Sequence, residues 1–283
     1  MALNLGGGSL TSNYSALYLG NAQSMLSQSL LRLSSGQRIN KPSDDPGGLA
    51  VSMKLKNAIT VTEATKRNVD NALSYTDTQD SALESVADIL DRMSTIKISY
   101  GSGTATTSDK SSYASEFKEL QKQLDVFKSE TFNSLSLFSS STVSKQVTIS
   151  TRGDSGPTIS ISSLDISGAL SVSSTINLAN ATGSVTISGI SIGNLTAAIT
   201  QVASLRATSG ATSSRLQFSS DFLDTSKTNL EAANSRIMDV DIADEVTNYA
   251  KYNVQVYAAS AALAQSNLNM GIVLDLLNFG SSR

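Results

Sequence analysis

Apolar residues recur at helical spacing along most of the chain, with polar residues between them. One face near the start carries an apolar residue every three or four positions, and a seven-residue repeat runs through the end. This spacing is typical of amphipathic helices that pack along a coiled-coil seam. The seam residues are Leu19, Ala22, Leu26, Leu30 and Leu33 in the first segment, and Ile242, Tyr249, Val256, Leu263, Met270 and Leu277 in the second.

Three further helices are predicted between these two segments. Residues 49–100 contain neither glycine nor proline and keep a helical apolar rhythm. A helix of roughly 50 residues is about 75 Å long, which a compact globule of this mass does not accommodate. A second helix is indicated by the apolar positions within 113–127. The third, within 195–237, follows a seven-residue repeat that only Ser209 interrupts.

The centre of the chain changes from helical spacing to alternation. Residues 147–150, 158–161 and 185–188 alternate apolar and small polar side chains, which is typical of half-buried strands. Glycines separate them as expected turns, at Gly153, Gly156, Gly168, Gly183 and Gly189. The predicted fold class is mainly α: an elongated helical rod bundle with a small antiparallel β region, plus terminal coiled-coil helices.

Three domains follow from these patterns. Residues 1–42 and 243–283 form the predicted domain of terminal helices. Residues 43–142 and 193–242 form the helical rod, and the β-rich insert 143–192 belongs to the rod.

Charge is spread very unevenly. No charged residue precedes Arg32, and none lies between Tyr252 and Leu274. The apolar end could suggest a membrane span, but the amides of Asn253, Gln265 and Asn269 are spread around the helix, which a lipid-facing surface would not tolerate. We therefore expect no membrane span.

Composition excludes several classes of site. The chain has 283 residues, a formal net charge of −3, and no cysteine or histidine. Disulfides, thiolate nucleophiles, Cys/His zinc sites and histidine bases are therefore absent. The acidic balance gives no reason to expect nucleic acid. The first residues also lack the charged start and continuous apolar segment of a cleaved secretory signal, so we expect export by another route.

The uncharged ends leave apolar stripes that need a partner. One interpretation is that the two terminal helices simply pair within a monomeric bundle. The other is that they also pack against neighbouring copies, through contacts that repeat without closing. The length of the predicted rod and the lack of charge at both ends favour open helical assembly.

The segment LSSGQRINKPSDDPGGLAVS (33–52) lies between the first two predicted helices. Gly36 suits a helix C-terminus and Pro42 bars its continuation. Ser43 is the expected N-cap of the long helix, with Asp44 and Asp45 in its first turn, where carboxylates meet the positive end of the helix dipole. The segment therefore predicts that the first helix ends here and that the long helix begins after a short connection, displaced from the axis of the first.

Three motifs resemble bacterial flagellins. The segment 33–52 looks like the N-terminal signature of that family. Residues 229–245 together with 263–267 and 274–277 look like its C-terminal counterpart, and the segment FNSLSLF (132–138) looks like the stretch ahead of its β region. Together these motifs cover most of both helical halves and are highly specific.

The resemblance implies a secreted, extracellular filament subunit. An enzyme is not expected, because the chain has no histidine and no cysteine, and no cofactor is expected either. The termini would line an inner tube, the rod would form the surrounding shell, and export would run through the flagellum's own channel. The implied partners are further copies of the chain, the hook-associated junction and cap proteins and a flagellar export chaperone. The insert is too short for the large outer domains of many flagellins, so the chain looks like a minimal subunit.

Two short stretches of the sequence depart from the usual pattern of the flagellin family. Pro46-Gly47-Gly48 stands where alanines are usual in the family. Many flagellins are recognised by an animal innate immune receptor through a segment that matches 90–99. Leu90 and Arg92 fit that segment, whereas Ser94 and Thr95 replace a common arginine and glutamate.

Charged residues at the two joints between helices are candidates for ion pairs between subunits. The alternative is solvated charge, which is worth little when exposed. We favour pairing between subunits, because both joints bracket the same layer of the predicted assembly. The candidates are Arg32, Arg38, Lys41, Asp44, Asp45, Arg236, Asp239 and Asp241.

Other functions are weighed against this one. Adjacent Asp44 and Asp45 are far more often caps than a catalytic pair. Residues 238–245 lack the glycine and the distant bidentate glutamate of a calcium loop. The nearest rival function is a flagellin-like protein of the hook–filament junction. A monomeric adhesin that binds through the β region is a rival of another class.

Overall fold

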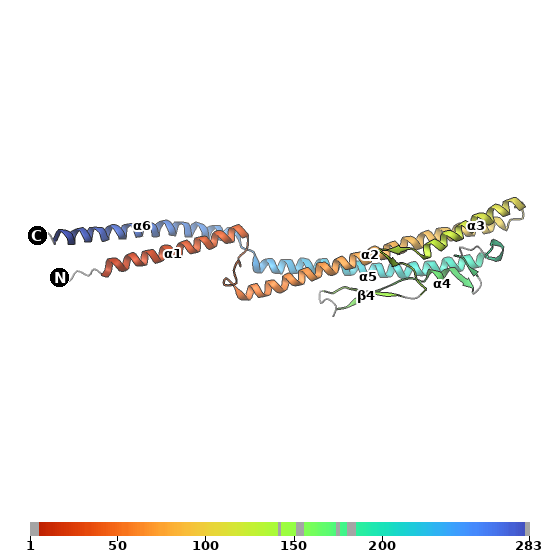
Figure 1. Cartoon of the computed structure of the whole chain (residues 1–283), viewed down its shortest axis with the longest axis horizontal. Coiled ribbons are helices and arrows are strands. Elements are labelled where there is room, and N and C mark those ends of the chain that lie inside the picture. The colour runs from red at the N-terminus through yellow and green to blue at the C-terminus, as the bar shows by residue number, and fades with distance from the viewer. Residues whose placement is uncertain (1–5, 141–142, 151–155, 174–175, 180–184, 281–283) are drawn as a thin grey trace. The chain divides into compact units, whose positions relative to one another are not determined.

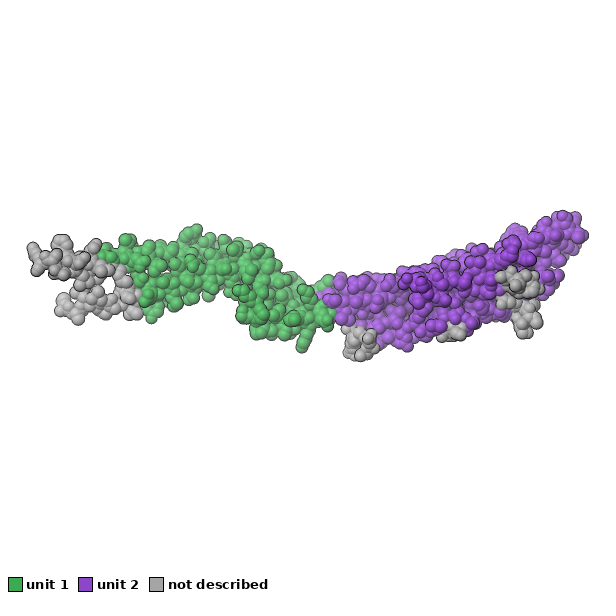
Figure 2. All heavy atoms as spheres, viewed as in Figure 1, with its two compact units in different colours: residues 1–57, 230–283 green, residues 58–229 purple. Residues whose placement is uncertain are grey.

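The computed structural model describes residues 6–140, 143–150, 156–173, 176–179 and 185–280. These residues form two compact units, residues 1–57 with 230–283 and residues 58–229, coloured green and purple in Figure 2. Within the described residues the helices, labelled in Figure 1 where space allows, are α1 (Gly6–Ser35), α2 (Pro46–Tyr100), α3 (Thr107–Lys128), α4 (Ile166–Leu170), α5 (Ile192–Met238) and α6 (Ile242–Gly280), and Ile187–Gly189 form a 3-10 turn, η2. The mainly α fold class is confirmed.

The core of the unit formed by residues 58–229 lies where α2, α3 and α5 pack together. Its members are the apolar positions of the helical repeats seen in the sequence, and their side chains are buried against one another and against β4 (Thr158–Ser162). Burial of this apolar surface is the main force that holds the helices together. The largest fully buried side chains on the three helices are Leu83, Leu90, Met93, Phe117, Leu124, Leu195 and Leu216.

A polar layer crosses this core at Ser209, where the seven-residue repeat is interrupted. Ser209 is 3% exposed and donates to the Thr76 carbonyl at 3.3 Å and to Gln79 Oε1 at 3.4 Å. Gln79 is 1% exposed, and its Nε2 donates to the Leu137 carbonyl at 2.7 Å. The interruption is therefore a satisfied set of buried hydrogen bonds and not a defect in the seam.

Ion pairs follow the edge of the antiparallel α2–α5 pair in the same unit. Lys66 Nζ lies 2.6 Å from Asp224 Oδ2, and Lys227 Nζ lies 2.6 Å from Glu63 Oε1. Arg206 contacts both carboxylate oxygens of Asp80 at 3.0 Å. Each exposed pair contributes little stability. Their regular order along the two helices favours one alignment.

In the part of the β region that the structure describes, the strands form three separate antiparallel pairs. They are β1 (Thr131–Phe132) with β2 (Leu135–Ser136), β3 (Ser144–Thr148) with β4, and β5 (Ser171–Ser173) with β6 (Ile176–Asn177). In β4, Ile159 and Ile161 are buried and Ser160 between them is exposed, as the alternation predicts. The FNSLSLF motif forms the β1–β2 hairpin, whose turn residues Asn133 and Ser134 have φ of 49° and 64°.

Two expectations for this region are wrong. Residues 185–188 do not form a strand, because Ile187 begins the 3-10 turn η2 and buries its side chain there. Gly168 is not a turn between strands but lies inside α4, where the Asp165 side chain accepts from its amide at 2.8 Å. An aspartate cap outweighs the glycine signal at this position. Gly153 and Gly183 lie outside the described residues.

The compact units divide the chain at other points than the predicted domains. The start of α2, up to residue 57, and the end of α5, from residue 230, are grouped with the terminal helices, and within this unit Ser52 Oγ donates to Asn234 Oδ1 at 2.7 Å. The division into 1–42 with 243–283, 43–142 with 193–242, and 143–192 therefore stays a prediction about how the chain is organised in an assembly.

Candidate functional site

The terminal helices α1 and α6 lie antiparallel and side by side (Figure 1). Their inward residues are spaced alternately by three and four, which is the repeat of a coiled coil. Near the open end of this pair, Ser12 Oγ donates to Asn267 Oδ1 at 3.2 Å. The inward positions are Ser12, Ser15, Leu19, Ala22, Leu26, Ser29 and Leu33 on α1, and Glu245, Tyr249, Tyr252, Val256, Ala259, Leu263 and Ser266 on α6.

Most of the seam residues expected from the sequence are found at this contact. Six of them are partly buried there: Leu19, Leu26, Leu33, Tyr249, Val256 and Leu263. Leu30 lies outside the α1–α6 contact, because its side chain is 56% exposed and Ser29 takes that position, so its part in packing between copies stays a prediction. Ile242 is likewise 52% exposed at the first position of α6. The side chains of Met270 and Leu277 lie outside the described residues.

A second apolar stripe remains on α6 after it has paired with α1. Its members recur at helical spacing on the face away from the seam, and each is at least 49% exposed. A soluble protein seldom leaves a row of large apolar side chains on one helix face in water, so the stripe indicates an interaction surface. The stripe consists of Val246, Val254, Tyr257, Leu268 and Ile272, and α1 exposes Tyr14, Leu17, Tyr18, Met25 and Leu31 in a similar way.

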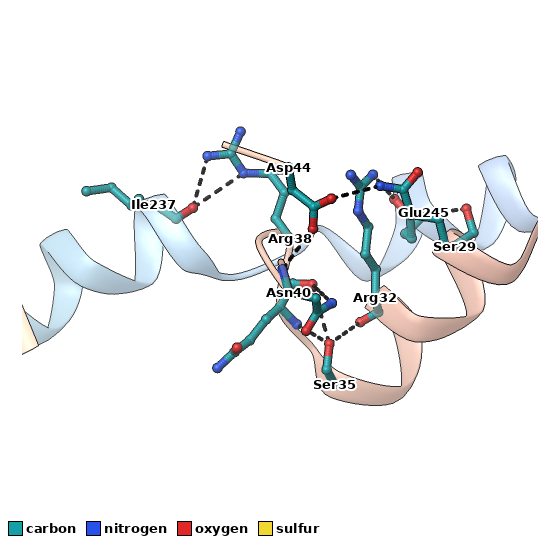
Figure 3. A network of polar contacts seen from close by, with 10 residues as sticks. Ser29, Arg32, Ser35, Arg38, Asn40, Asp44, Ile237 and Glu245 are labelled. Carbon is teal, nitrogen blue, oxygen red and sulfur yellow. Dashed lines mark hydrogen bonds and ion pairs between the residues drawn. The ribbon is translucent and has the colours of Figure 1, made fainter. Parts of the chain in front are cut away.

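The seam ends at a buried polar cluster, drawn in Figure 3. Glu245 is 5% exposed and Ser29 is 2% exposed, and the Ser29 hydroxyl donates to the Glu245 carboxylate. Arg32 Nη1 lies 3.9 Å from the same carboxylate. A buried carboxylate is tolerated only with such partners. The cluster therefore favours one register of α1 against α6.

Beside this cluster, the connection between α1 and α2 and the connection between α5 and α6 are joined by backbone hydrogen bonds. The Arg38 amide donates to the Met238 carbonyl at 2.6 Å, and the Val240 amide donates to the Gly36 carbonyl at 3.0 Å. Gly36 ends α1 with a φ of +70°, a conformation that favours glycine, as the sequence predicts. The Arg38 guanidinium also donates to the Ile237 carbonyl at 3.0 Å (Figure 3).

The start of α2 differs from the prediction. Asp45, and not Ser43, caps the helix, because its carboxylate accepts from the Gly48 amide at 2.8 Å and the helix begins at Pro46. Proline suits the first position of a helix, where its missing N–H is not needed. A Cβ at Gly48 would lie 2.4 Å from the Asp45 carboxylate, so the close cap leaves no room for a larger residue at this position.

Most of the charged residues predicted to pair between subunits already have partners within the chain. The carboxylates of Asp44, Asp45 and Asp241 accept from backbone amides at the starts of turns and helices, and Asp239 accepts from the Ser235 hydroxyl. Arg32 and Arg38 contact Glu245 and Ile237. Of these eight charged residues, only Lys41 and Arg236 have side chains without a hydrogen-bond or ion-pair partner among the described residues. Pairing between subunits stays a prediction, and these two cations are its best remaining candidates.

The predicted receptor segment is only partly on the surface. Arg92 is exposed and pairs with Glu116, with Nη2 to Oε1 at 2.6 Å. Leu90 is fully buried in the core of its unit, so its side chain cannot contact a receptor in the folded chain. Recognition by an innate receptor stays a prediction that depends on Arg92 and its exposed neighbours.

The described residues contain no cluster of acidic side chains arranged to hold a metal ion. A cavity of about 340 Å³ lies beside the joint, lined by α1 and the following turn. Its charged members are Arg32, Lys41 and Asp44. In the described part of the chain, no helix has a stretch apolar enough to cross a membrane.

The turn before α2 depends on one carboxylate. The pKa of Asp44 lies below its ordinary value, chiefly because the carboxylate accepts from the amide of Lys41, then from that of Asn40, with Arg32 and Lys41 adding positive charge. A lowered pKa in the fold means that the unfolded chain binds the proton more readily. The turn is therefore stabilised above the ordinary pKa and loses this contribution as the pH falls through the lower, folded value.

We expect the Asn40 and Lys41 amide resonances to stay constant from pH 7 to about pH 5 and to shift only in stronger acid. Asp44→Asn removes the titrating group and should abolish this acid shift. NMR titration of both proteins measures it. A shift centred near neutral pH, or one that persists in the Asp44→Asn protein, would contradict the assignment.

Comparison with known proteins assigns the chain to a family. The bacterial flagellin N-terminal helical region matches residues 10–142, and the bacterial flagellin C-terminal helical region matches residues 192–277. A flagellin of Halalkalibacterium halodurans is 29% identical over 87% of this chain and 89% of its own length. The flagellar filament 33 kDa core protein of Treponema phagedenis is 29% identical over 94% of this chain and 98% of its own length.

Among solved structures, Bacillus cereus flagellin is 26% identical and aligns with a TM-score of 0.47 over 59% of this chain and 94% of its own length. The two matched family regions include α1 to α3 on one side of the β region and α5 with most of α6 on the other. The chain belongs to the bacterial flagellin family.

Proposed function

We propose that the chain is the structural subunit of a bacterial flagellar filament and polymerises through its terminal helices. The observation that carries this proposal is the apolar stripe on α6, which stays at least 49% exposed after α1 has covered the opposite face. The family match and the filament core protein of Treponema phagedenis support the same function. The interpretation in which the termini only pair within one chain accounts for the seam but leaves this stripe in water.

The proposed filament function and the exposed α6 stripe together indicate which partner proteins the subunit needs. An extracellular filament needs further copies as its main partner, and junction and cap proteins at its two ends. Before export, the α6 stripe needs cover, because an exposed apolar surface of this kind associates prematurely. A flagellar export chaperone that binds α6 would supply that cover.

Electron microscopy of the purified full-length protein at neutral pH tests the proposal. We expect long tubes above a critical concentration. A junction protein of the same family would form at most short oligomers, and an adhesin would stay monomeric at every concentration. Either of these outcomes at concentrations of about 1 mM, where weak contacts are still populated, would refute the filament function.

A further inference from the structure

Two phenylalanines on α5 are exposed in the unit formed by residues 58–229. Phe218 is 71% exposed and Phe222 is 64% exposed. The other phenylalanines with described side chains are at least partly covered, and Phe117 and Phe138 are 1% and 3% exposed. Phenylalanine gains more from burial than most residues, so an exposed pair one helical turn apart is an unusual surface.

This pair lies on the face of α5 opposite the core. Leu216 and Leu223 are fully buried, and at 100° per residue their side chains lie on the other side of the helix from Phe218. The face that carries the aromatic pair continues toward the helix start through small exposed residues, Ala207, Ala211 and Ser214. A partner could therefore approach the helix closely beside two protruding rings.

Some of the charged side chains around the two phenylalanines have bonding partners within the chain, and one does not. Asp224 pairs with Lys66, and Asp221 accepts from the Gln217 amide at 3.0 Å. The exposed Arg215 guanidinium has no hydrogen-bond or ion-pair partner among the described residues. The surface thus offers two aromatic rings with a free cation beside them, and suits an apolar surface that carries a carboxylate.

The size of the surface limits what can occupy it. Two phenylalanine side chains expose at most about 300 Å², whereas a stable complex of two free proteins buries about 800 Å² on each partner. The pair is therefore too small to hold a free partner by itself. Copies that are already held together through the terminal helices meet at a high effective concentration, and there a small contact is enough.

We propose that Phe218, Phe222 and Arg215 form a contact with a second copy of the chain, between the units formed by residues 58–229 of neighbouring subunits. This contact is separate from the terminal helices and adds to the polymer contact that they make. The inference rests on the proposed filament function, because it needs neighbouring copies held in place.

The test is the double substitution Phe218→Ser with Phe222→Asn in the full-length protein. The critical concentration for polymerisation, measured by sedimentation, is expected to rise by about tenfold or more. Thermal melting of the unpolymerised protein should not fall, because both rings are exposed. The matched control is Ile98→Ser, which removes a side chain that is 61% exposed on α2 of the same unit and should leave the critical concentration unchanged.

Each outcome separates this contact from the filament function. If the wild-type protein forms filaments and the double variant has the same critical concentration, the contact is refuted and the filament function stands. If the wild-type protein forms no filaments, both fail. A photoreactive phenylalanine analogue at position 218 provides a second measurement: crosslinks of twice the chain mass in filaments support the contact, and crosslinks within a single chain only refute it.

Discussion

Replacing Val254 and Tyr257 together by aspartate is expected to abolish filament formation while leaving the chain folded. The two side chains are 67% and 70% exposed on the α6 stripe, so the single chain loses almost no packing when they are changed. In a polymer the stripe is buried against other copies, and a buried carboxylate without a partner is strongly unfavourable. We expect the critical concentration to rise by at least about 100-fold, which corresponds to about 2.7 kcal/mol.

Sedimentation and electron microscopy measure this effect, and circular dichroism verifies that the helices persist. The matched control carries the same added charge on the flanks of the stripe, as Gln255→Asp with Ser260→Asp, and should reduce assembly much less. Filaments of normal length and critical concentration from the Val254/Tyr257 variant would rule out the stripe as the polymerisation surface.

Leu90→Ala is expected to have the largest effect on stability. Leu90 is fully buried between the helices of its unit, and removal of a buried leucine side chain leaves a cavity that the neighbours fill only in part. The free energy of unfolding should fall by about 3 kcal/mol. Urea denaturation of the unpolymerised full-length protein, followed by circular dichroism, gives this value.

The control for this prediction lies two turns further along the same helix. Ile98 is 61% exposed, and Ile98→Ala should change the free energy of unfolding by less than about 0.5 kcal/mol. Equal effects of the two substitutions would show that Leu90 is not a core residue. That result would return it to the set of candidate receptor contacts.

The long helices were predictable because their signal is repeated many times. In α2 and α5 the apolar positions recur through more than ten turns, so no single ambiguous residue changes the interpretation. The stop at Gly36 was predictable for a different reason, since only a residue without a Cβ readily adopts its positive φ. Hydrophobic periodicity and backbone chemistry thus explain most of the fold.

The predictions that differ from the structure are those in which neighbouring residues could each have taken the same role. The apolar pattern points to Leu30 in the seam, yet the alternation of three and four requires Ser29, whose hydroxyl donates to Glu245. Three adjacent residues, Ser43, Asp44 and Asp45, can each cap a helix, and only the position of the turn selects Asp45. The charged joint residues mostly bond within the chain, which depends on three-dimensional proximity that spacing does not reveal.

The polar layer at Ser209 and Gln79 has a mechanical consequence. If α5 slid along α2 by one turn, about 5.4 Å, the Ser209 hydroxyl would lose its acceptors, the Thr76 carbonyl and Gln79 Oε1, inside an apolar interior, and the Arg206–Asp80 ion pair beside them would be misaligned. Sliding is therefore penalised at several points at once. A twisting load applied to this unit would be carried by stiff helices that cannot ratchet past one another, which is the property that a rotating propeller needs from its building block.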